Sequence, residues 1–472
     1  MFQLAHGSPI PLVAQIVSGF QQLIEAQGLK PGGKLPSIRQ FAQAQGVSVF
    51  TVVEAYDRLV ALGLVHSKPN AGFFVRPRAA ASGPAAAEVQ VQFDPKWYLR
   101  QIFESRALEI KAGCGWLPQD WLFEEGVHRA FRQLAQEGAE LGGYGSPFGH
   151  AELRVLLAEL LAERQIKATA DSVLLTQGSS QALDLLARHW VRPGEPVLVD
   201  SPGYPNILYI LRFLGATLLP VPRTPEGYDL PALEALLAAH KPRVFFTQPR
   251  LHSPTNSSAP INQLLRILQL AHLHEFNIVE NDIYADLDPD LHPSLASLDQ
   301  LQRVAYLGSF SKTISPNLRV GFVAGAPQLL EALATLKMVS GLTSSDLTER
   351  LVLRALTEGR WRKHLAKLRG RLSTAQQDVS EQLRQHGFEL HTQAAAGMYL
   401  WARHPDIPDA AELSQQAAQD GIMLGPGHLF YPEPRQSGWL RFNVAFSGEP
   451  RLWAWLGAQV QEAGVRAGLT LG

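Results

Sequence analysis

Apolar residues recur at helical spacing from about residue 10 onward, and Gly28 follows them. This pattern predicts a first helix that Gly28 closes. Its apolar positions are Ile10, Leu12, Val13, Ile16, Val17, Phe20, Leu23 and Ile24. Ser37 is a typical N-cap for a short second helix that extends through Gln45. Ser48 is a typical N-cap for a third helix, which ends before Gly63.

Two strand-like pieces follow the third helix, at residues 64–67 and 73–75. Three helices and a hairpin predict a winged helix-turn-helix over residues 1–77. The next stretch, residues 78–95, is rich in Ala, Gly and Pro and poor in large apolar side chains. Such a stretch buries too little surface to fold alone, so we interpret it as a linker.

From about residue 96 short apolar runs alternate with helical patterns. The runs lie at residues 173–175, 197–199, 244–246, 278–279 and 304–307. The alternation predicts an α/β domain over residues 96–472, with a mostly parallel sheet covered by helices on both faces. Ligands bind such sheets at the carboxyl ends of the strands.

Composition narrows the class of protein. The 472 residues carry a formal net charge of −1 and suggest more than one domain. Residues 1–78 hold seven basic and three acidic residues, a net charge of +4, which leaves −5 for the remainder. The single Cys114 permits no internal disulfide and suits a reducing compartment. Because neither a signal sequence nor a run of roughly 20 apolar residues is visible, we expect a cytoplasmic protein without membrane spans.

Candidate chemistry centres on Lys312, in the run Ser309-Phe310-Ser311-Lys312 that ends an apolar strand. A lysine can form a Schiff base with an aldehyde, while neighbouring hydroxyls and Arg319 can hold a phosphate. This combination is the chemistry of pyridoxal 5′-phosphate. No metal site is expected.

Other candidate residues follow the predicted strands. Ser179 and Ser180 open a helix after a glycine turn, where free amides suit a phosphate. Tyr204 follows the next strand and suits stacking on a planar ring. Asp282 and Tyr284 are two residues apart after a later strand, which puts both on the same side of an extended chain.

Residues 1–77 resemble the DNA-binding domain of the GntR family of bacterial regulators. The matching runs are Leu35-Pro36-Ser37-Ile38-Arg39, Gly46-Val47-Ser48-Val49-Phe50-Thr51-Val52, Ala55-Tyr56 and the wing Ala71-Gly72-Phe73-Phe74-Val75. The resemblance implies a double-stranded DNA operator contacted by Arg39, Ser48, Thr51 and Lys68. Val49 departs from the family, in which an arginine is common there. The alternative for this unit is a protein interaction module.

The remainder resembles fold type I pyridoxal-phosphate enzymes of the aminotransferase kind, with a smaller C-terminal α/β subdomain. The resemblance implies that Lys312 binds the cofactor covalently, that Asp282 pairs with its ring nitrogen and that Tyr284 contacts its ring hydroxyl. It further implies a stacking role for Tyr204 and a phosphate site formed by Ser179, Ser180, Ser309, Ser311 and Arg319. Tyr144 would reach the phosphate of a neighbouring subunit, and Arg441 would receive a substrate carboxylate.

One position departs from this second family. Ser253 stands in Ser253-Pro254-Thr255-Asn256, where the family has an asparagine that touches the cofactor's ring hydroxyl. Because serine is shorter, the departure puts turnover in doubt more than cofactor binding.

A GntR-type head joined to an aminotransferase-like domain resembles the MocR subfamily of regulators. The resemblance implies a homodimeric, pyridoxal-phosphate-dependent transcription factor that senses an effector with amino and carboxylate groups, or the cofactor itself. Two alternatives stay open: a working aminotransferase with an appended head, and a DNA-binding scaffold with a vestigial sensor.

Overall fold

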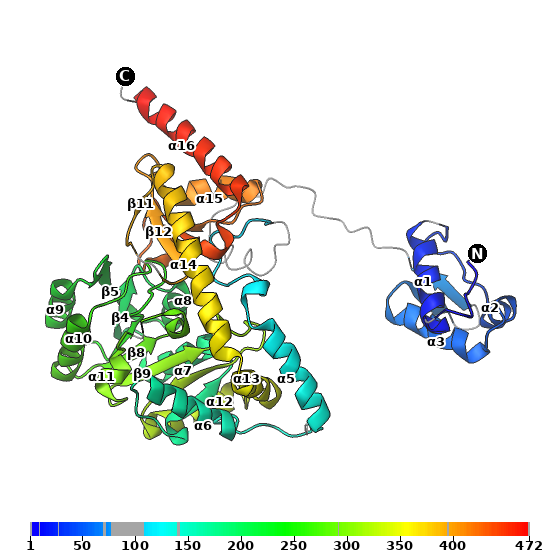
Figure 1. The fold of residues 1–472 in the computed structure, drawn as a ribbon, viewed down its shortest axis with the longest axis horizontal. Coiled ribbons are helices and arrows are strands. Elements are labelled where there is room, and N and C mark those ends of the chain that lie inside the picture. The colour runs from blue at the N-terminus through cyan, green and yellow to red at the C-terminus, as the bar shows by residue number, and fades with distance from the viewer. Residues whose placement is uncertain are drawn as a thin grey trace. The chain divides into compact units, whose positions relative to one another are not determined.

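The computed structural model describes residues 2–8, 10–26, 28–68, 72–76, 108–138, 142–290, 292–393 and 396–470. The chain divides into two compact units, residues 1–90 and 91–472. Figure 1 shows the elements of each unit. The predicted linker, residues 78–95, lies outside the described residues, so its boundaries stay predictions.

The N-terminal unit contains the predicted helices and hairpin. They are α1 (Leu12–Glu25), α2 (Ile38–Gln45), α3 (Val49–Ala61), β1 (Val65–Lys68) and β2 (Gly72–Val75). The side chains of Ser37 and Ser48 accept hydrogen bonds from first-turn amides of α2 and α3, which confirms both N-caps. Helix α1 ends at Glu25, short of the predicted end at Gly28, with Ala26 as its C-cap.

Aromatic packing builds the core of this unit. Phe20, Phe41 and Tyr56 are almost fully buried. The rings of Phe20 and Tyr56 meet edge to face with centroids 5.6 Å apart. The Tyr56 hydroxyl donates to the carbonyl of Pro36 over 3.0 Å, which ties α3 to the segment just before α2. Burying a hydroxyl group costs little free energy only when the group is hydrogen-bonded, as the Tyr56 hydroxyl is.

The C-terminal unit is built on an eight-stranded sheet with the order β3-β10-β9-β8-β7-β4-β5-β6. The strands are β3 (Val173–Thr176), β4 (Pro196–Ser201), β5 (Thr217–Thr224), β6 (Gly227–Tyr228), β7 (Val244–Thr247), β8 (Asn277–Asn281), β9 (Val304–Ser309) and β10 (Gly321–Ala324). Strands β5, β4, β7, β8 and β9 run parallel, whereas β10 is antiparallel to both β3 and β9. The predicted, mostly parallel sheet is therefore confirmed.

Helices cover both faces of this sheet (Figure 1). One apolar core holds buried residues of α5 (Glu124–Glu137), α6 (Ala151–Glu163), α9 (Leu230–Ala239), α10 (Ile261–Leu273), α11 (Leu295–Asp299) and α13 (Asp346–Thr357). A second core holds buried residues of α7 (Gly178–Trp190), α8 (Pro205–Phe213) and α12 (Pro327–Gly341). Strand residues alternate between the two cores, as the pleat requires.

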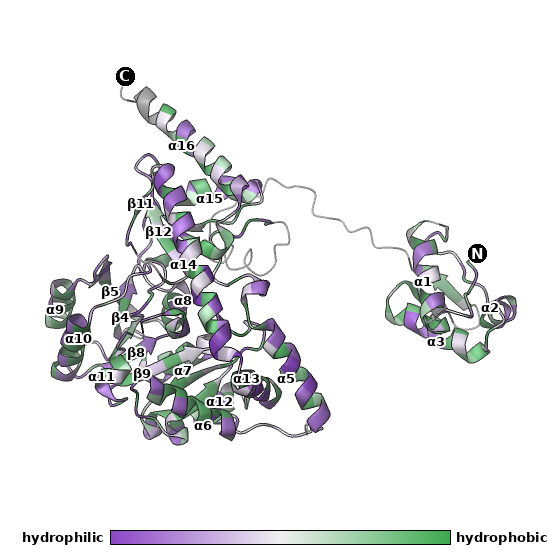
Figure 2. Cartoon of the chain, in the orientation of Figure 1, coloured by the Kyte–Doolittle hydropathy of each residue, from purple (hydrophilic) through white to green (hydrophobic). Residues whose placement is uncertain are grey.

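A smaller subdomain follows the sheet. It contains a four-stranded sheet in the order β11-β12-β14-β13. Its elements are α14 (Trp361–Gln385), β11 (Glu389–Leu390), β12 (Tyr399–Arg403), α15 (Ala410–Gln419), β13 (Gly425–Pro426), β14 (Trp439–Asn443) and α16 (Pro450–Thr470). Helix α14 mixes hydrophobic and hydrophilic residues along its length, as expected of a helix with one buried side (Figure 2). Within the described residues, no helix is long and apolar enough to cross a membrane.

Candidate cofactor site and nucleic-acid interface

Two strand ends and a helix start converge at one edge of the large sheet. Strand β10 lies between β3 and β9, with Gly321 opposite both Thr176 and Ser309. The N-terminus of α7, with Ser179 and Ser180, therefore comes close to the hydroxyl-bearing segment after β9. The Ser309 hydroxyl lies 3.1 Å from that of Ser311 and accepts from its backbone amide.

Arg319 completes this group. Its guanidinium donates to the carbonyl of Gln177 over 3.1 Å and lies 3.5 Å from the Ser311 hydroxyl. A Cβ atom on Gly178 would lie 2.4 Å from an Arg319 nitrogen, and Gly178 has a φ of 76°. Glycine is therefore required at the start of α7. Helix amides, hydroxyls and an arginine together suit a dianionic phosphate.

Lys312 lies beside this group and is half-buried. Its amine donates to the carbonyl of Gly115, in the loop that precedes η1 (Gln119–Trp121). Burial, followed by the positive charges of Arg441 and Arg319, lowers the pKa of Lys312 to about 8. More of this amine is therefore neutral near physiological pH than in an ordinary lysine, and the neutral form is the one that attacks an aldehyde.

Tyr204 is the N-cap of α8 and lies near the phosphate-binding residues. Ser180 lies close enough to interact with its hydroxyl. Burial raises the pKa of Tyr204, so the phenol stays neutral. A ring held in this way offers a flat surface beside the phosphate-binding group.

Arg441, on β14, brings the smaller subdomain to the site. Its guanidinium is 5% exposed and donates to the Gly113 carbonyl over 2.8 Å and to the Ser253 hydroxyl over 3.3 Å. It also lies over the rings of Tyr399 and Phe430, at 4.5 and 4.8 Å from their centroids. A buried arginine aimed at the site suits a carboxylate.

Tyr284 belongs to the same cluster. Its hydroxyl lies 3.0 Å from that of Tyr399, and both tyrosines are buried. Burial raises the pKa of Tyr284 well above its ordinary value, with a further contribution from Tyr399. The structure thus brings together Lys312, Tyr284 and Arg441 from distant parts of the sequence.

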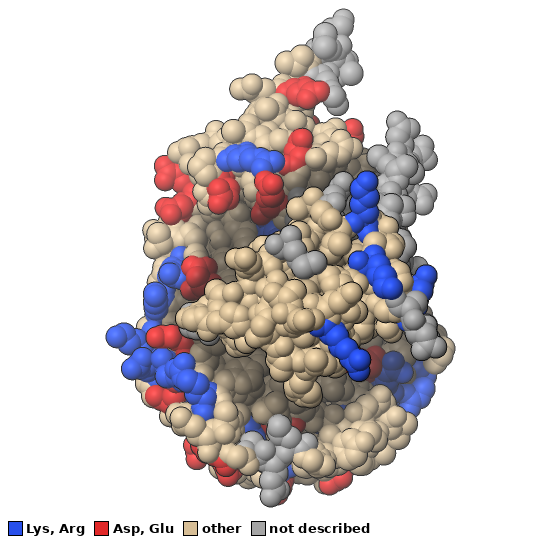
Figure 3. All heavy atoms as spheres, turned by 90° about the vertical axis from the view of Figure 1, so that its right-hand side faces the viewer, with Lys and Arg blue, Asp and Glu red and all other residues tan. Residues whose placement is uncertain are grey.

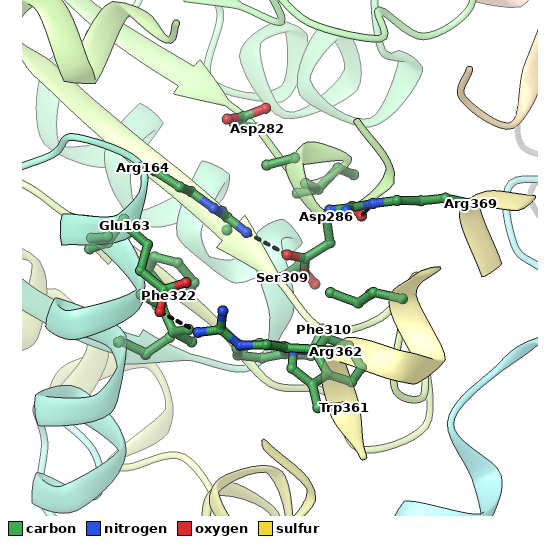
Figure 4. Close-up of a pocket in the computed structure, with 17 residues that line it drawn as sticks. Glu163, Arg164, Asp282, Asp286, Ser309, Phe310, Phe322, Trp361, Arg362 and Arg369 are labelled. Atoms are coloured by element: carbon green, nitrogen blue, oxygen red, sulfur yellow. Dashed lines mark hydrogen bonds and ion pairs between the residues drawn. The ribbon is translucent and has the colours of Figure 1, made fainter. Parts of the chain in front are cut away.

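Asp282 does not join this cluster. Its carboxylate accepts two hydrogen bonds from Arg250, over 3.1 and 2.7 Å. It lines a cavity of about 260 Å³ with Arg164 and Asp286 (Figure 4). The expected common side for Asp282 and Tyr284 fails because β8 ends at Asn281 and the chain turns there, so the alternation of a strand does not extend to Tyr284.

Tyr144 lies in the loop before α6 and is 85% exposed. Its expected contact would be with a second subunit, so its role stays a prediction.

Several site residues were not expected from the sequence. The Gly115 carbonyl accepts from the Lys312 amine, and the Tyr399 hydroxyl is hydrogen-bonded to the Tyr284 hydroxyl. Asn443 holds the Gly115 loop in place by donating to the carbonyls of Cys114 and Trp116. Asn443 follows Arg441 by two residues on the same strand, which was the only signal available for it.

The N-terminal unit exposes the start of α3. Ser48 and Thr51 lie in its first turn, where the Ser48 hydroxyl accepts from the Thr51 amide over 3.0 Å. Val49 and Phe50 are 50% and 76% exposed beside them. Arg39 is exposed at the start of α2, and Lys68 is exposed on β1 with its amine 5.0 Å from the centre of the Phe74 ring.

Charge within this unit favours a polyanion. Basic and acidic side chains are interspersed on the face of the molecule drawn in Figure 3. Residues 1–78 nevertheless carry a net charge of +4, given by seven basic and three acidic residues, which favours binding to a polyanion such as DNA.

Comparisons with known proteins agree with both units. Residues 5–75 match the model of the bacterial regulatory proteins of the GntR family, and residues 119–450 match the model of aminotransferase class I and II. An uncharacterized HTH-type transcriptional regulator of Bacillus subtilis, YisV, is 26% identical over 95% of both chains. The probable rhizopine catabolism regulatory protein MocR of Rhizobium meliloti is 28% identical, over 93% of this chain and 91% of its own.

Among solved structures, the α-aminoadipate aminotransferase LysN of Thermus thermophilus is similar with a TM-score of 0.72 and 28% identity. The match covers 78% of this chain and 95% of that one. LysN was solved with a phosphopyridoxyl-leucine adduct.

Fold and site together define a pyridoxal-phosphate-binding protein of fold type I joined to a winged helix-turn-helix. The chain belongs to the aminotransferase class I and II family, and its GntR-type head places it with the MocR-like regulators within that family. The group of Ser179, Ser180, Ser309, Ser311, Arg319 and Lys312 fits this cofactor, which supplies an electrophilic aldehyde when bound.

Proposed function

We propose that this chain is a pyridoxal-phosphate-dependent transcriptional regulator whose DNA binding responds to a small ligand with amino and carboxylate groups. The single observation that carries the proposal is the pairing, in one chain, of a GntR-type head with a lysine and arginine site of the aminotransferase kind. Regulators similar along almost the whole chain support it against a plain aminotransferase.

The exposed first turn of α3 would contact DNA. A helix of this kind inserts its N-terminal side chains into the major groove. Ser48 and Thr51 would contact the operator there, while Arg39 and Lys68 would contact phosphates or base edges. The excess of positive charge in residues 1–78 would steer the unit toward DNA.

Lys312 and Arg441 would take part in binding the small ligand. A ligand amine would take the place of the Lys312 amine at the cofactor aldehyde, and its carboxylate would be received by Arg441 as a bidentate pair. Arg441 donates to the Ser253 hydroxyl and to the Gly113 carbonyl. The carboxylate would compete with these two weaker acceptors.

Coupling would run through the smaller subdomain. Arg441 belongs to this subdomain, whereas Lys312 and the phosphate-binding residues belong to the large sheet. A ligand that touches both would favour one arrangement of the two parts. It would shift that equilibrium only by its differential affinity for the two arrangements.

A homodimer would carry this change to DNA. Tyr144 is exposed and would reach the phosphate site of the partner subunit. Two heads on one dimer would read two half-sites, so a change in the large domains would alter their spacing. We also propose a cytoplasmic location, because the chain binds DNA and holds its one cysteine, Cys114, as a buried free thiol.

The test begins with a genome-wide footprint of the protein, which supplies the operator. The purified protein is then titrated with amino acids while its visible spectrum is recorded, and each hit is added to a DNA-binding assay. An amino acid that changes both spectrum and DNA affinity supports the proposal. Sustained transamination with a keto acid, without any effect on DNA binding, would instead support the enzyme.

A further inference from the structure

We infer that Asn281, rather than Asp282, is the side chain that meets the ring nitrogen of the cofactor, so that a neutral amide stands where the family pattern led us to expect a carboxylate. The inference rests on the cofactor site proposed above and concerns how this chain tunes that site.

Strand β8 sends neighbouring residues to opposite faces of the sheet. Val279 packs in the core formed with α7 and α8. Glu280 points the other way and accepts from the backbone amides of Leu295 and Ala296, at the start of α11. Asn281, as the last residue of the strand, shares the face of Val279. That face leads to Tyr204 and to the phosphate-binding end of α7.

Asp282 is hydrogen-bonded to Arg250 on the face of the sheet that α11 covers. Its partner Arg250 holds it with two hydrogen bonds and also donates to Asp288 over 3.1 Å and to the His292 carbonyl over 2.7 Å. Asp282 and Arg250 are 2% and 6% exposed. Figure 4 shows Asp282 beside a cavity whose other labelled acidic and basic residues include Arg164 and Asp286.

The charged groups that interact with Asp282 differ from those that interact with Lys312. The carboxylate of Asp282 contributes to the raised pKa values of Arg250, Arg164 and Tyr306. Burial, followed by the positive charges of Arg441 and Arg319, lowers the pKa of Lys312, and Cys114 opposes this shift. To reach the cofactor, Asp282 would have to give up both hydrogen bonds from Arg250 and leave that buried guanidinium with Asp288 as its remaining carboxylate partner, which is costly.

Asn281 lies where a ring edge would arrive. It lines a small cavity of about 20 Å³ with Tyr204, Asp200 and Gln248. Its side chain is 5% exposed, and its amide oxygen has no hydrogen-bond partner among the described residues. Buried polar atoms are nearly always partnered, so an orphaned one beside the stacking tyrosine points to a ligand atom.

Asp200, the other carboxylate of this cavity, is already engaged. It accepts from the Thr247 hydroxyl over 2.9 Å and from the Gln248 amide over 2.8 Å. Arg223 lies 3.9 Å away and His252 lies 3.5 Å away. These contacts offset the charge of Asp200, whereas the amide oxygen of Asn281 and the amide nitrogen of Gln248 have no hydrogen-bond partner among the described residues.

The consequence is electronic. A carboxylate beside the ring nitrogen favours its protonated form, which makes the ring a strong electron sink. An amide accepts from a protonated nitrogen through its oxygen or, after a half-turn that exchanges its oxygen and nitrogen, donates to an unprotonated one, and it adds no charge to either. Asn281 therefore makes the ring of this protein a weaker electron sink, which suits a ligand sensor better than a fast transaminase.

The test reads the ring nitrogen directly. The full-length protein is loaded with pyridoxal phosphate that carries ¹⁵N in the ring, and the nitrogen resonance is recorded for the parent, for Asn281→Asp and for Asp282→Asn. We expect the parent to show a neutral nitrogen and Asn281→Asp to show a protonated one. Asp282→Asn is expected to keep the parent's resonance and to lose stability.

A protonated nitrogen in the parent, or an Asn281→Asp resonance identical to the parent's, overturns the inference. If Asp282→Asn does not fold, the parent and Asn281→Asp still decide. A protein that takes up no labelled cofactor would contradict the cofactor site itself, an outcome distinct from a protonated ring nitrogen.

Discussion

The guanidinium of Arg441 lies 3.3 Å from the hydroxyl of Ser253, two side chains that belong to different subdomains and are 188 residues apart in the sequence. Ser253 stands where the family has an asparagine that contacts the cofactor. In this chain it holds the arginine expected to receive a carboxylate. The contact links the departure at Ser253 to ligand recognition as well as to cofactor electronics.

Replacing Arg441 by alanine is expected to abolish the spectral response to amino acids, because a buried bidentate partner of a carboxylate contributes about 2–5 kcal/mol. Covalent cofactor and basal DNA binding should remain. Spectral titration with an amino-acid panel checks this. Arg441→Lys is the matched control: it keeps the charge, loses the fork and should respond weakly. An unchanged response in Arg441→Ala would remove Arg441 from the ligand site.

The pH dependence of cofactor uptake follows from Lys312. Its pKa is lowered to about 8, so the neutral amine that bonds to the aldehyde accumulates as pH rises through that value. Covalent uptake by the apoprotein should therefore accelerate with rising pH, with its midpoint near pH 8, and level off above that value. Arg441→Ala removes a nearby positive charge and should move the midpoint to higher pH. Uptake is followed by visible absorbance.

Lys312→Ala and Lys312→Arg serve as controls for this uptake. Both lack the nucleophile and should retain at most non-covalent cofactor, detected by mass spectrometry after borohydride reduction. A reduced covalent adduct in either variant would contradict the assignment of Lys312.

Operator binding should weaken steeply with salt, because counterions are released from DNA when basic residues bind. Arg39→Ala is expected to cost a further 1–3 kcal/mol or so if Arg39 contacts a base edge. Gel shifts at two salt concentrations measure both effects. Arg266→Ala, a change on the exposed surface of the large unit, is the matched control and should bind like the parent. Salt-independent binding would argue against this docking mode.

The pair of Arg250 and Asp282 should be a major contributor to stability. Arg250→Ala leaves Asp282 and Asp288 buried without their partner, and breaking such a pair typically costs about 3–5 kcal/mol. Arg266→Ala breaks an exposed pair with Glu234 and should cost about 1 kcal/mol or less. Urea unfolding followed by tryptophan fluorescence compares the two, and equal costs would contradict the structural role given to Arg250.

Local sequence signals predicted the parts of the site that are local in the chain. Ser37 and Ser48 were recognisable from the sequence as helix N-caps. Ser179 and Ser309 were recognisable as candidate phosphate-binding residues because each lies at or just after the end of an apolar strand. The structure confirms both caps, and it brings the strand ends before Ser179 and at Ser309 to one edge of the sheet. The assignment of individual binding roles stays a prediction.

Local sequence signals could not predict hydrogen-bond partners that are far apart in the sequence. Gly115 and Tyr399 lie far from Lys312 and Tyr284 in the sequence, and no spacing rule relates them. The common side expected for Asp282 and Tyr284 failed for a different reason. The alternation of a strand was extended past Asn281, where the backbone already turns.

The most direct measurement of the central claim is operator affinity with and without a ligand. Fluorescence anisotropy with the footprinted operator is recorded for the cofactor-loaded parent and for Arg441→Ala, with each amino acid that perturbs the parent's spectrum. The regulator proposed here predicts a change in the parent's dissociation constant that is absent in Arg441→Ala. If no amine-bearing ligand alters the parent's affinity, while added pyridoxal phosphate alone does, the protein senses cofactor supply and the amino-acid sensor is contradicted.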